Sequence, residues 1–169
     1  MRSRAAPLGV AAIAASVISA VSACAPRQPA LTPAHSAAIQ DSVRTMLDDL
    51  RRYWAAKQWD SVTALYVGDS TLRWVEDGRV AMRSRATLQQ GFAAIPPTTT
   101  VRTTYDSLEV TPVVAGVASV LASYHSTFTD TVHGNATFGG LLTMTVIHRP
   151  GGWRILTGHS SSPRQAGTR

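Results

Sequence analysis

The amino-acid sequence predicts an α+β fold in which N-terminal helices pack on one face of a curved antiparallel sheet. Between residues 32 and 93, apolar residues recur at spacings of three and four, which is typical of amphipathic helices. From residue 100 onward, long segments rich in Thr and Val alternate with turn residues, as antiparallel strands do. A curved sheet around a long helix leaves a conical cavity, a natural place for a small molecule.

Three helices are expected in the first half. The first begins at Thr32-Pro33, because Thr is a frequent N-cap and Pro is favoured at the first helical position, and it ends near residue 57. Asp60 is expected to cap a second, short helix, and Ser84 a third that ends before Pro96-Pro97. The apolar positions of these helices are Ile39, Val43, Met46, Leu50, Tyr53 or Trp54, Val62, Leu65, Tyr66, Leu88 and Phe92.

The strands follow in order. Leu72 and Trp74 alternate with polar residues and lead into a turn at residues 76–78. Four longer strands are then expected at residues 101–113, 117–129, 135–148 and 153–161, the last two joined by the hairpin turn Pro150-Gly151-Gly152.

The N-terminal segment resembles a bacterial lipoprotein signal. A positive start at residues 2–4 precedes an uncharged, mostly apolar run at 5–23, and the small residues Ser22 and Ala23 stand before Cys24. The resemblance implies lipidation of Cys24 and a place in the cell envelope, at the outer membrane if the cell has one, since Ala25 is not aspartate. Ordinary cleavage after Ala23 and an uncleaved anchor are the alternatives.

Four regions result. Residues 1–23 are the predicted signal peptide, and residues 24–34 are the lipidated cysteine with a Pro-bearing linker, semi-rigid enough to hold a domain off a membrane. Residues 35–162 are expected to form the folded domain, and residues 163–169 a basic tail.

Composition and motifs exclude several classes of function. The net charge is +6, but the arginines are scattered without interleaved aromatic residues, so no nucleic-acid partner is expected. No metal and no cofactor is expected, because the chain lacks His-x-His spacing, a cysteine pair and a phosphate-binding glycine loop. A serine hydrolase is not expected either, because no Gly-x-Ser-x-Gly occurs.

Several segments together resemble SnoaL-like members of the nuclear transport factor 2-like superfamily, over residues 35–162. They are residues 55–60, 64–66 and Asp69, residues 74–78, and residues 149–155 with His159 and Ser161. The resemblance implies a cystatin-like cone and a homodimer. It does not specify an activity, because the superfamily includes isomerases, cyclases, dehydratases and noncatalytic binding or assembly domains.

His159 and Tyr124 are the weak catalytic candidates. By period-two alternation His159 shares a face with Trp153 and Thr157, and we expect that face to line the cavity; the alternative is a strand-end histidine bonded to nearby hydroxyls. Tyr124 is expected either to point into the cavity or to belong to the core. The expected ligand pocket comprises Trp74, Tyr124, Trp153, Thr157 and His159.

Two hypotheses of function remain. The first is a membrane-tethered domain whose cone binds a small apolar ligand or acts in assembly. The second is an isomerase-, cyclase- or dehydratase-type enzyme that uses His159 and Tyr124. The first is preferred, because no carboxylate lies within an apolar alternation; Asp106 and Glu109, at odd separation, are expected on opposite faces of their strand.

Overall fold

The computed structural model describes residues 30–132 and 134–162. The predicted signal peptide, Cys24, most of the predicted linker and the basic tail lie outside the described residues, so these predictions stay predictions. Within the described ranges, no helix is long and apolar enough to cross a membrane.

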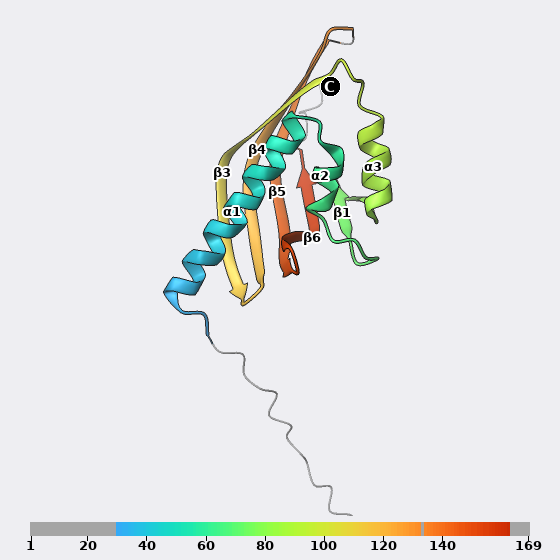
Figure 1. Ribbon diagram of the computed structural model, residues 1–169. Helices are drawn as coiled ribbons and strands as arrows, with labels where there is room; N and C mark the ends of the chain where they lie inside the picture. The colour runs from blue at the N-terminus through green and yellow to red at the C-terminus, as the bar shows by residue number, and fades with distance from the viewer. Residues whose placement is uncertain (1–29, 133, 163–169) are drawn as a thin grey trace, which may run out of the picture.

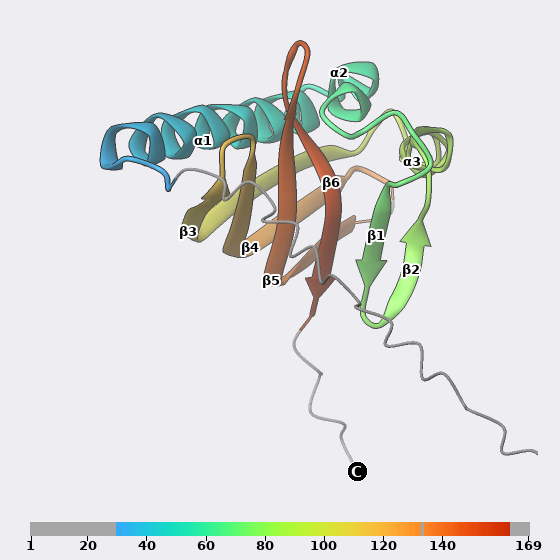
Figure 2. The ribbon, with the colours of Figure 1, turned by 90° about the horizontal axis from the view of Figure 1, so that it is seen from below.

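The predicted α+β architecture is confirmed. Three helices, α1 (Pro33–Ala55), α2 (Trp59–Ala64) and α3 (Arg85–Ala93), lie on one side of a single curved sheet (Figures 1 and 2). The strands are β1 (Arg73–Glu76), β2 (Arg79–Met82), β3 (Thr100–Val114), β4 (Val117–Asp130), β5 (Gly134–Arg149) and β6 (Gly152–Ser161). Their order in the sheet is β2-β1-β6-β5-β4-β3. The sheet is mixed rather than wholly antiparallel, because β1 pairs with β6 in parallel.

The long helix α1 begins as its sequence indicates. The Thr32 side chain accepts a hydrogen bond from the His35 backbone N–H at 3.2 Å, and Pro33 takes the first helical position. The helix then lies across the concave face of the sheet, mainly against β3 (Figure 2). It ends where Lys57 adopts a left-handed conformation (φ 54°), and the chain turns directly into α2.

The two short helices start differently. Gln58, not Asp60, is the N-cap of α2, and Asp60 lies inside the first turn, where its carboxylate is favoured by the helix dipole. The expectation for α3 is confirmed. The Ser84 and Thr87 side chains each bond the other's backbone N–H in a capping box, and Leu88 and Phe92 are buried.

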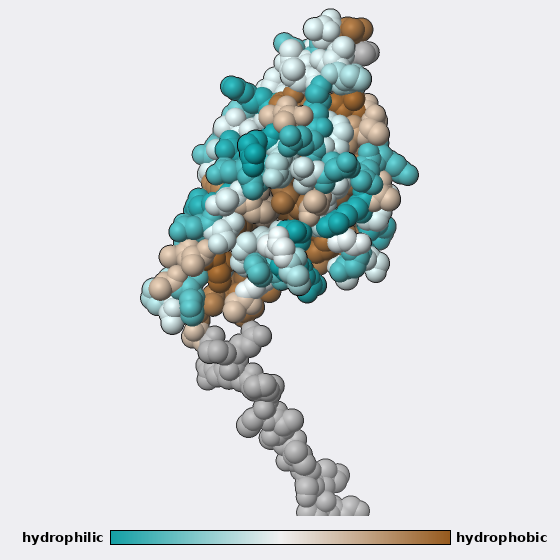
Figure 3. Space-filling view, viewed as in Figure 1, coloured by the Kyte–Doolittle hydropathy of each residue, from teal (hydrophilic) through white to brown (hydrophobic). Residues whose placement is uncertain are grey.

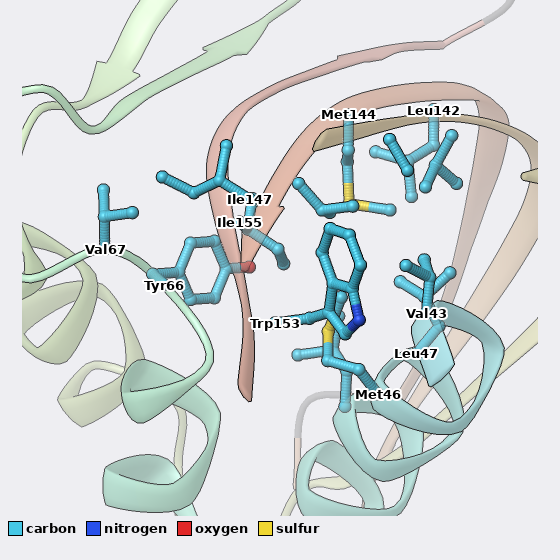
Figure 4. Close-up of a cluster of buried hydrophobic side chains, with 14 of the residues drawn as sticks. Val43, Met46, Leu47, Tyr66, Val67, Leu142, Met144, Ile147, Trp153 and Ile155 are labelled. Atoms are coloured by element: carbon cyan, nitrogen blue, oxygen red, sulfur yellow. The ribbon is translucent and has the colours of Figure 1, made fainter. Parts of the chain in front are cut away.

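The core fills the space between α1 and the sheet. Trp153 of β6 packs against Met46 and Leu47 of α1, with Met144 and Ile155 beside it (Figure 4). Burial of such apolar surface is the main source of stability in a domain of this size.

Two irregularities in pairing change which side chains face the helices. Opposite the step from Thr145 to Val146, β6 contains an extra residue, Leu156, so Ile155 pairs with Val146 and Thr157 with Thr145. The pairing of β3 with β4 also shifts register between Tyr105 and Ser107. Asp106, which lies between them, therefore has no pairing partner on β4. At such bulges the alternation of faces is interrupted.

Candidate functional site: an aromatic cavity

A cavity of about 330 Å³ lies between the helices and the concave face of the sheet. This volume is at the small end of the range for ligand pockets in proteins. Aromatic side chains from α1, α3 and most strands form much of its wall. They are Trp54, Tyr66, Trp74, Phe92, Tyr105, Tyr124, Phe128 and Phe138. In the view of Figure 3, brown hydrophobic atoms show between the teal side chains that cover α1 and α3.

Ring contacts hold two parts of this wall in place. Phe92 of α3 packs edge-on against Trp54 of α1, with ring centroids 4.8 Å apart, and it stacks on Trp59 of α2 at 5.2 Å. On the sheet side, Phe128 of β4 and Phe138 of β5 stack at 4.9 Å. The three helices are therefore held together by aromatic contacts beside the cavity.

Trp74 forms the wall nearest to β6. Its indole N–H donates to the Glu76 carboxylate at 3.1 Å, and its ring meets Tyr66 edge-on at 6.0 Å. The ring lies directly over Gly158, where a Cβ atom would overlap it. Glycine is thus required at position 158 for close packing of the indole rather than for backbone conformation.

Three tyrosines line the cavity, and burial raises the pKa of each. The pKa of Tyr105 rises to about 12, although the nearby Arg51 cation lowers it in part. Burial raises the pKa of Tyr66 still further, with smaller contributions from Tyr105 and Glu76. For Tyr124, burial raises the pKa and a hydrogen bond with Ser160 opposes it. All three phenols are therefore neutral at physiological pH.

Among the described residues, the charged side chains that line the cavity are Arg51, Glu76 and Asp77. Glu76 and Asp77 line the cavity at the end of β1 and are exposed to solvent. The Asp77 carboxylate accepts a hydrogen bond from the Ser162 backbone N–H at 2.8 Å, which joins the β1–β2 turn to the end of β6. Arg51 pairs with Asp48 at 2.8 Å and lies over the Tyr105 ring, 5.6 Å from its centroid.

The structure brings together two of the five predicted pocket residues. Trp74 and Tyr124 line the cavity. Trp153 is buried in the core and borders a different, open hollow at the start of α1 together with His35 and His148.

Thr157 and His159 are not in the cavity, and His159 is exposed. The expectation for these two side chains assumed unbroken alternation from Trp153. The extra residue Leu156 reverses the faces, so Gly158 and Ser160 point to the helices instead. No histidine among residues 30–132 and 134–162 lines the cavity.

A bulge also corrects the expectation for Asp106 and Glu109. Asp106 is unpaired at a register shift of β3, and both carboxylates are exposed on the strand. Asp106 lies 2.9 Å from the Nδ1 atom of His125, which is on the convex face of β4. In the described part of the chain, no group of three or more His, Cys, Asp or Glu side chains is placed to hold a metal ion.

Sequence reasoning missed several cavity residues. The helical pattern predicts only a packing role for Tyr66 and Phe92, and no pattern singles out Tyr105, Phe128 or Phe138, yet all five line the cavity. Period-two alternation does place Phe128 on the same face of β4 as Tyr124, so part of the aromatic wall was available in the sequence.

Comparison with known proteins identifies the fold. No protein-family model and no curated protein matches the chain. Among solved structures, a nuclear transport factor 2 (NTF2-like) superfamily protein from Salmonella enterica is 14% identical, with 78% of this chain and 96% of that chain covered and a TM-score of 0.66. A putative scytalone dehydratase from Novosphingobium aromaticivorans is 13% identical, with 75% and 85% covered and a TM-score of 0.64.

A ketosteroid isomerase-like protein from Erwinia carotovora atroseptica is 16% identical, with 74% of this chain and 96% of that chain covered and a TM-score of 0.60. Likeness at these identities shows that the chain has the NTF2-like cone fold. Such likeness does not show an activity, because one fold can host many functions.

The contact between Gly158 and Trp74 predicts a specific effect of Gly158→Ala. The added methyl group displaces the indole, so we expect a loss of about 1–3 kcal/mol in the free energy of unfolding and an altered near-ultraviolet circular dichroism spectrum. Urea unfolding measures the first quantity.

Gly91→Ala is the matched control, because Gly91 lies within α3 and no atom stands near the added methyl group. That variant should gain up to about 1 kcal/mol from helix propensity. Equal stability of Gly158→Ala and the wild-type protein would contradict the packing argument.

Proposed function

We propose that this chain of NTF2-like fold is a membrane-tethered envelope domain that binds a small apolar ligand in its cone. The observation that supports binding is the composition of the cavity wall, in which aromatic side chains surround a volume of about 330 Å³. Transfer of an apolar molecule from water to such a wall is favourable by about 25 cal/mol per Å² of apolar surface buried.

The charges around the cavity favour an uncharged ligand. Glu76 and Asp77 stand at one edge and disfavour anions. The Arg51 guanidinium is already paired with Asp48, so its positive charge is partly compensated. The tyrosine hydroxyls are neutral, because burial raises their pKa values.

An enzyme is the second candidate. Structural neighbours include proteins described as a putative scytalone dehydratase and as ketosteroid isomerase-like. With His159 outside the cavity, a proton-transfer reaction would depend on Glu76, the carboxylate that accepts from Trp74, or on Asp77 next to it. Both carboxylates are exposed to solvent at the end of β1, so binding without chemistry is the preferred function.

Tethering is proposed from the sequence. Lipidation of Cys24 would leave a short Pro-bearing linker before the start of α1 at Pro33, and would hold the cavity domain near a bilayer surface. Apolar molecules concentrate there, which agrees with an apolar cavity.

Two adjacent residues of β6 provide a test of ligand binding. Ser160 lines the cavity, whereas His159 points away from it, so Ser160→Trp should fill the cavity and His159→Trp should not. The probe is phenylnaphthylamine, an uncharged dye that fluoresces in apolar surroundings. We expect Ser160→Trp to raise its dissociation constant at least about tenfold.

His159→Trp should bind the dye as the wild-type protein does. If the two variants weaken binding equally, the dye is not in the cone. If the wild-type protein takes up no dye and none of a set of other uncharged aromatic compounds, the proposal of an apolar ligand is wrong.

Lipidation of Cys24 can be tested by metabolic labelling in a bacterial host. Radiolabelled palmitate should be incorporated into the wild-type chain and lost completely in Cys24→Ser. Fractionation should find the wild-type chain in membranes. Labelling that survives Cys24→Ser, or no labelling of either chain, would contradict the proposed anchor.

A homodimer is also proposed, by resemblance. The convex face of the sheet exposes Leu121 and Leu141 on neighbouring strands, in a surface otherwise rich in Thr and Ser. Light scattering should give twice the mass of the chain, and Leu121→Asp should reduce it. A monomeric wild-type protein would overturn this expectation.

A further inference from the structure

Five arginines from distant parts of the sequence lie at one end of the domain. The segment at residues 65–72 runs beside the start of β6, because the Val67 N–H donates to the Ile155 carbonyl at 3.0 Å and the Ile155 N–H donates to the Leu65 carbonyl at 2.8 Å. β1 begins where this segment ends, and it pairs with β6 on one side and with β2 on the other. The arginines of this region are Arg73, Arg83, Arg85, Arg149 and Arg154.

Three of these arginines belong to the β1–β2 hairpin and the start of α3. Trp74 of β1 pairs with Met82 of β2. Arg73 and Arg83 flank this pair, so both lie at the open end of the hairpin. Arg85 is the first residue of α3, and its guanidinium donates to two backbone carbonyls at the end of α2, at 3.0 and 3.3 Å.

The other two arginines flank the β5–β6 turn. The Arg154 guanidinium donates to a carbonyl of this turn at 3.0 Å. Hydrogen bonds from Thr71 lower the pKa of Asp69, which lies in the segment before β1. Arg149 and Arg85 lower this pKa further, so both cations lie within electrostatic range of the same carboxylate.

This group of five arginines, the basic face, carries an uncompensated positive charge. No ion pair joins any of the five to a carboxylate among the residues that the structure describes. Asp69 is the only acidic residue in the segments that make up the region, which are residues 64–73, 82–85 and 149–154. Three of the arginines are exposed to solvent, namely Arg73, Arg83 and Arg149.

The basic face lies at the end of the molecule where the predicted linker joins the fold. Leu31, two residues before α1, lines an open hollow together with His148 and Trp153. These two residues are the immediate chain neighbours of Arg149 and Arg154. Figure 1 shows the start of α1 and the β5–β6 turn at this end, whereas the β4–β5 hairpin extends from the opposite end.

We propose that the basic face binds the anionic surface of the bilayer to which the chain is tethered, through the phosphate groups of its lipids. The inference rests on the proposed anchor at Cys24 and goes beyond it, because it assigns a membrane contact to the folded domain. Guanidinium groups bind phosphate through charge-assisted hydrogen bonds, and basic residues close to an anionic bilayer attract it together. In this orientation Glu76 and Asp77, at the other end of β1, lie on the side away from the bilayer.

Co-sedimentation with lipid vesicles tests the contact. The full chain carries Cys24→Ser, so that no lipid anchor contributes, and the vesicles are phosphatidylcholine alone or with about one third phosphatidylglycerol. We expect at least about tenfold tighter binding to the anionic vesicles, lost as salt is raised. Adding Arg83→Ser and Arg149→Ser should lower this binding at least about tenfold, because two charges leave the face. Neither guanidinium makes a hydrogen bond within the described residues, so the fold should be kept.

Arg79→Ser with Arg102→Ser is the matched control. It removes the same net charge, but Arg79 lies at the turn of the β1–β2 hairpin and Arg102 near the start of β3, away from the basic face. This pair should change binding by less than about twofold. Arg83→Lys with Arg149→Lys keeps the charge and should retain binding. Circular dichroism checks folding, and Arg83→Ser alone, with about a fivefold loss expected, replaces the serine pair if that pair misfolds.

Three results would overturn the inference. Equal binding to both kinds of vesicle means that the arginines do not select anionic lipids. Equal loss in the two serine pairs means that only net charge is sensed. No binding to anionic vesicles leaves an acidic protein as the partner of this face. None of these results bears on palmitate labelling or on dye binding, so the proposed anchor and cavity function are decided by their own tests.

Discussion

The course of the last strand depends on a single extra residue. Leu156 has no partner on β5, and its insertion reverses the alternation of β6 halfway along. Before it, Trp153 and Ile155 enter the core; after it, Gly158 packs under the Trp74 indole and Ser160 lines the cavity. The first half of the strand therefore stabilises the fold, and the second half forms the wall of the site.

Gly158 links this strand to the rest of the cavity. Because glycine has no side chain, the Trp74 indole can lie on the backbone of β6, and β1 can pair with β6 in parallel. The position of Trp74 in turn determines where Tyr66 and Glu76 stand, through one ring contact and one hydrogen bond. The wall is thus positioned by backbone pairing and not by loops, which favours a preformed pocket.

Most of the fold could be predicted from the sequence, because it follows from local patterns. The cap at Thr32, the capping-box serine Ser84 and the four long strands all correspond to elements in the structure. The short strand β2 and the parallel pairing of β1 were not predicted, since they depend on contacts between distant parts of the chain.

The site was less predictable for the same reason. One unpaired residue in a strand leaves no clear signal in composition or periodicity, yet it moves His159 out of the cavity and Ser160 into it. The bulge at Asp106 has a similar effect on β3. Alternation located Tyr124 and Trp74, but the presence of Tyr66, which follows α2, and of Tyr105 in the same cavity lining depends on tertiary packing.

The stacked pair Phe128 and Phe138 has an evolutionary consequence. These rings line the cavity, but they belong to the end of the β4–β5 hairpin that extends beyond the helices (Figure 1), and Phe138 is 46% exposed. Replacing a half-exposed side chain costs little folding free energy compared with replacing a core residue. Relatives of this protein can therefore acquire new ligand preferences by exchanging hairpin residues, while the core beneath α1 keeps the fold intact.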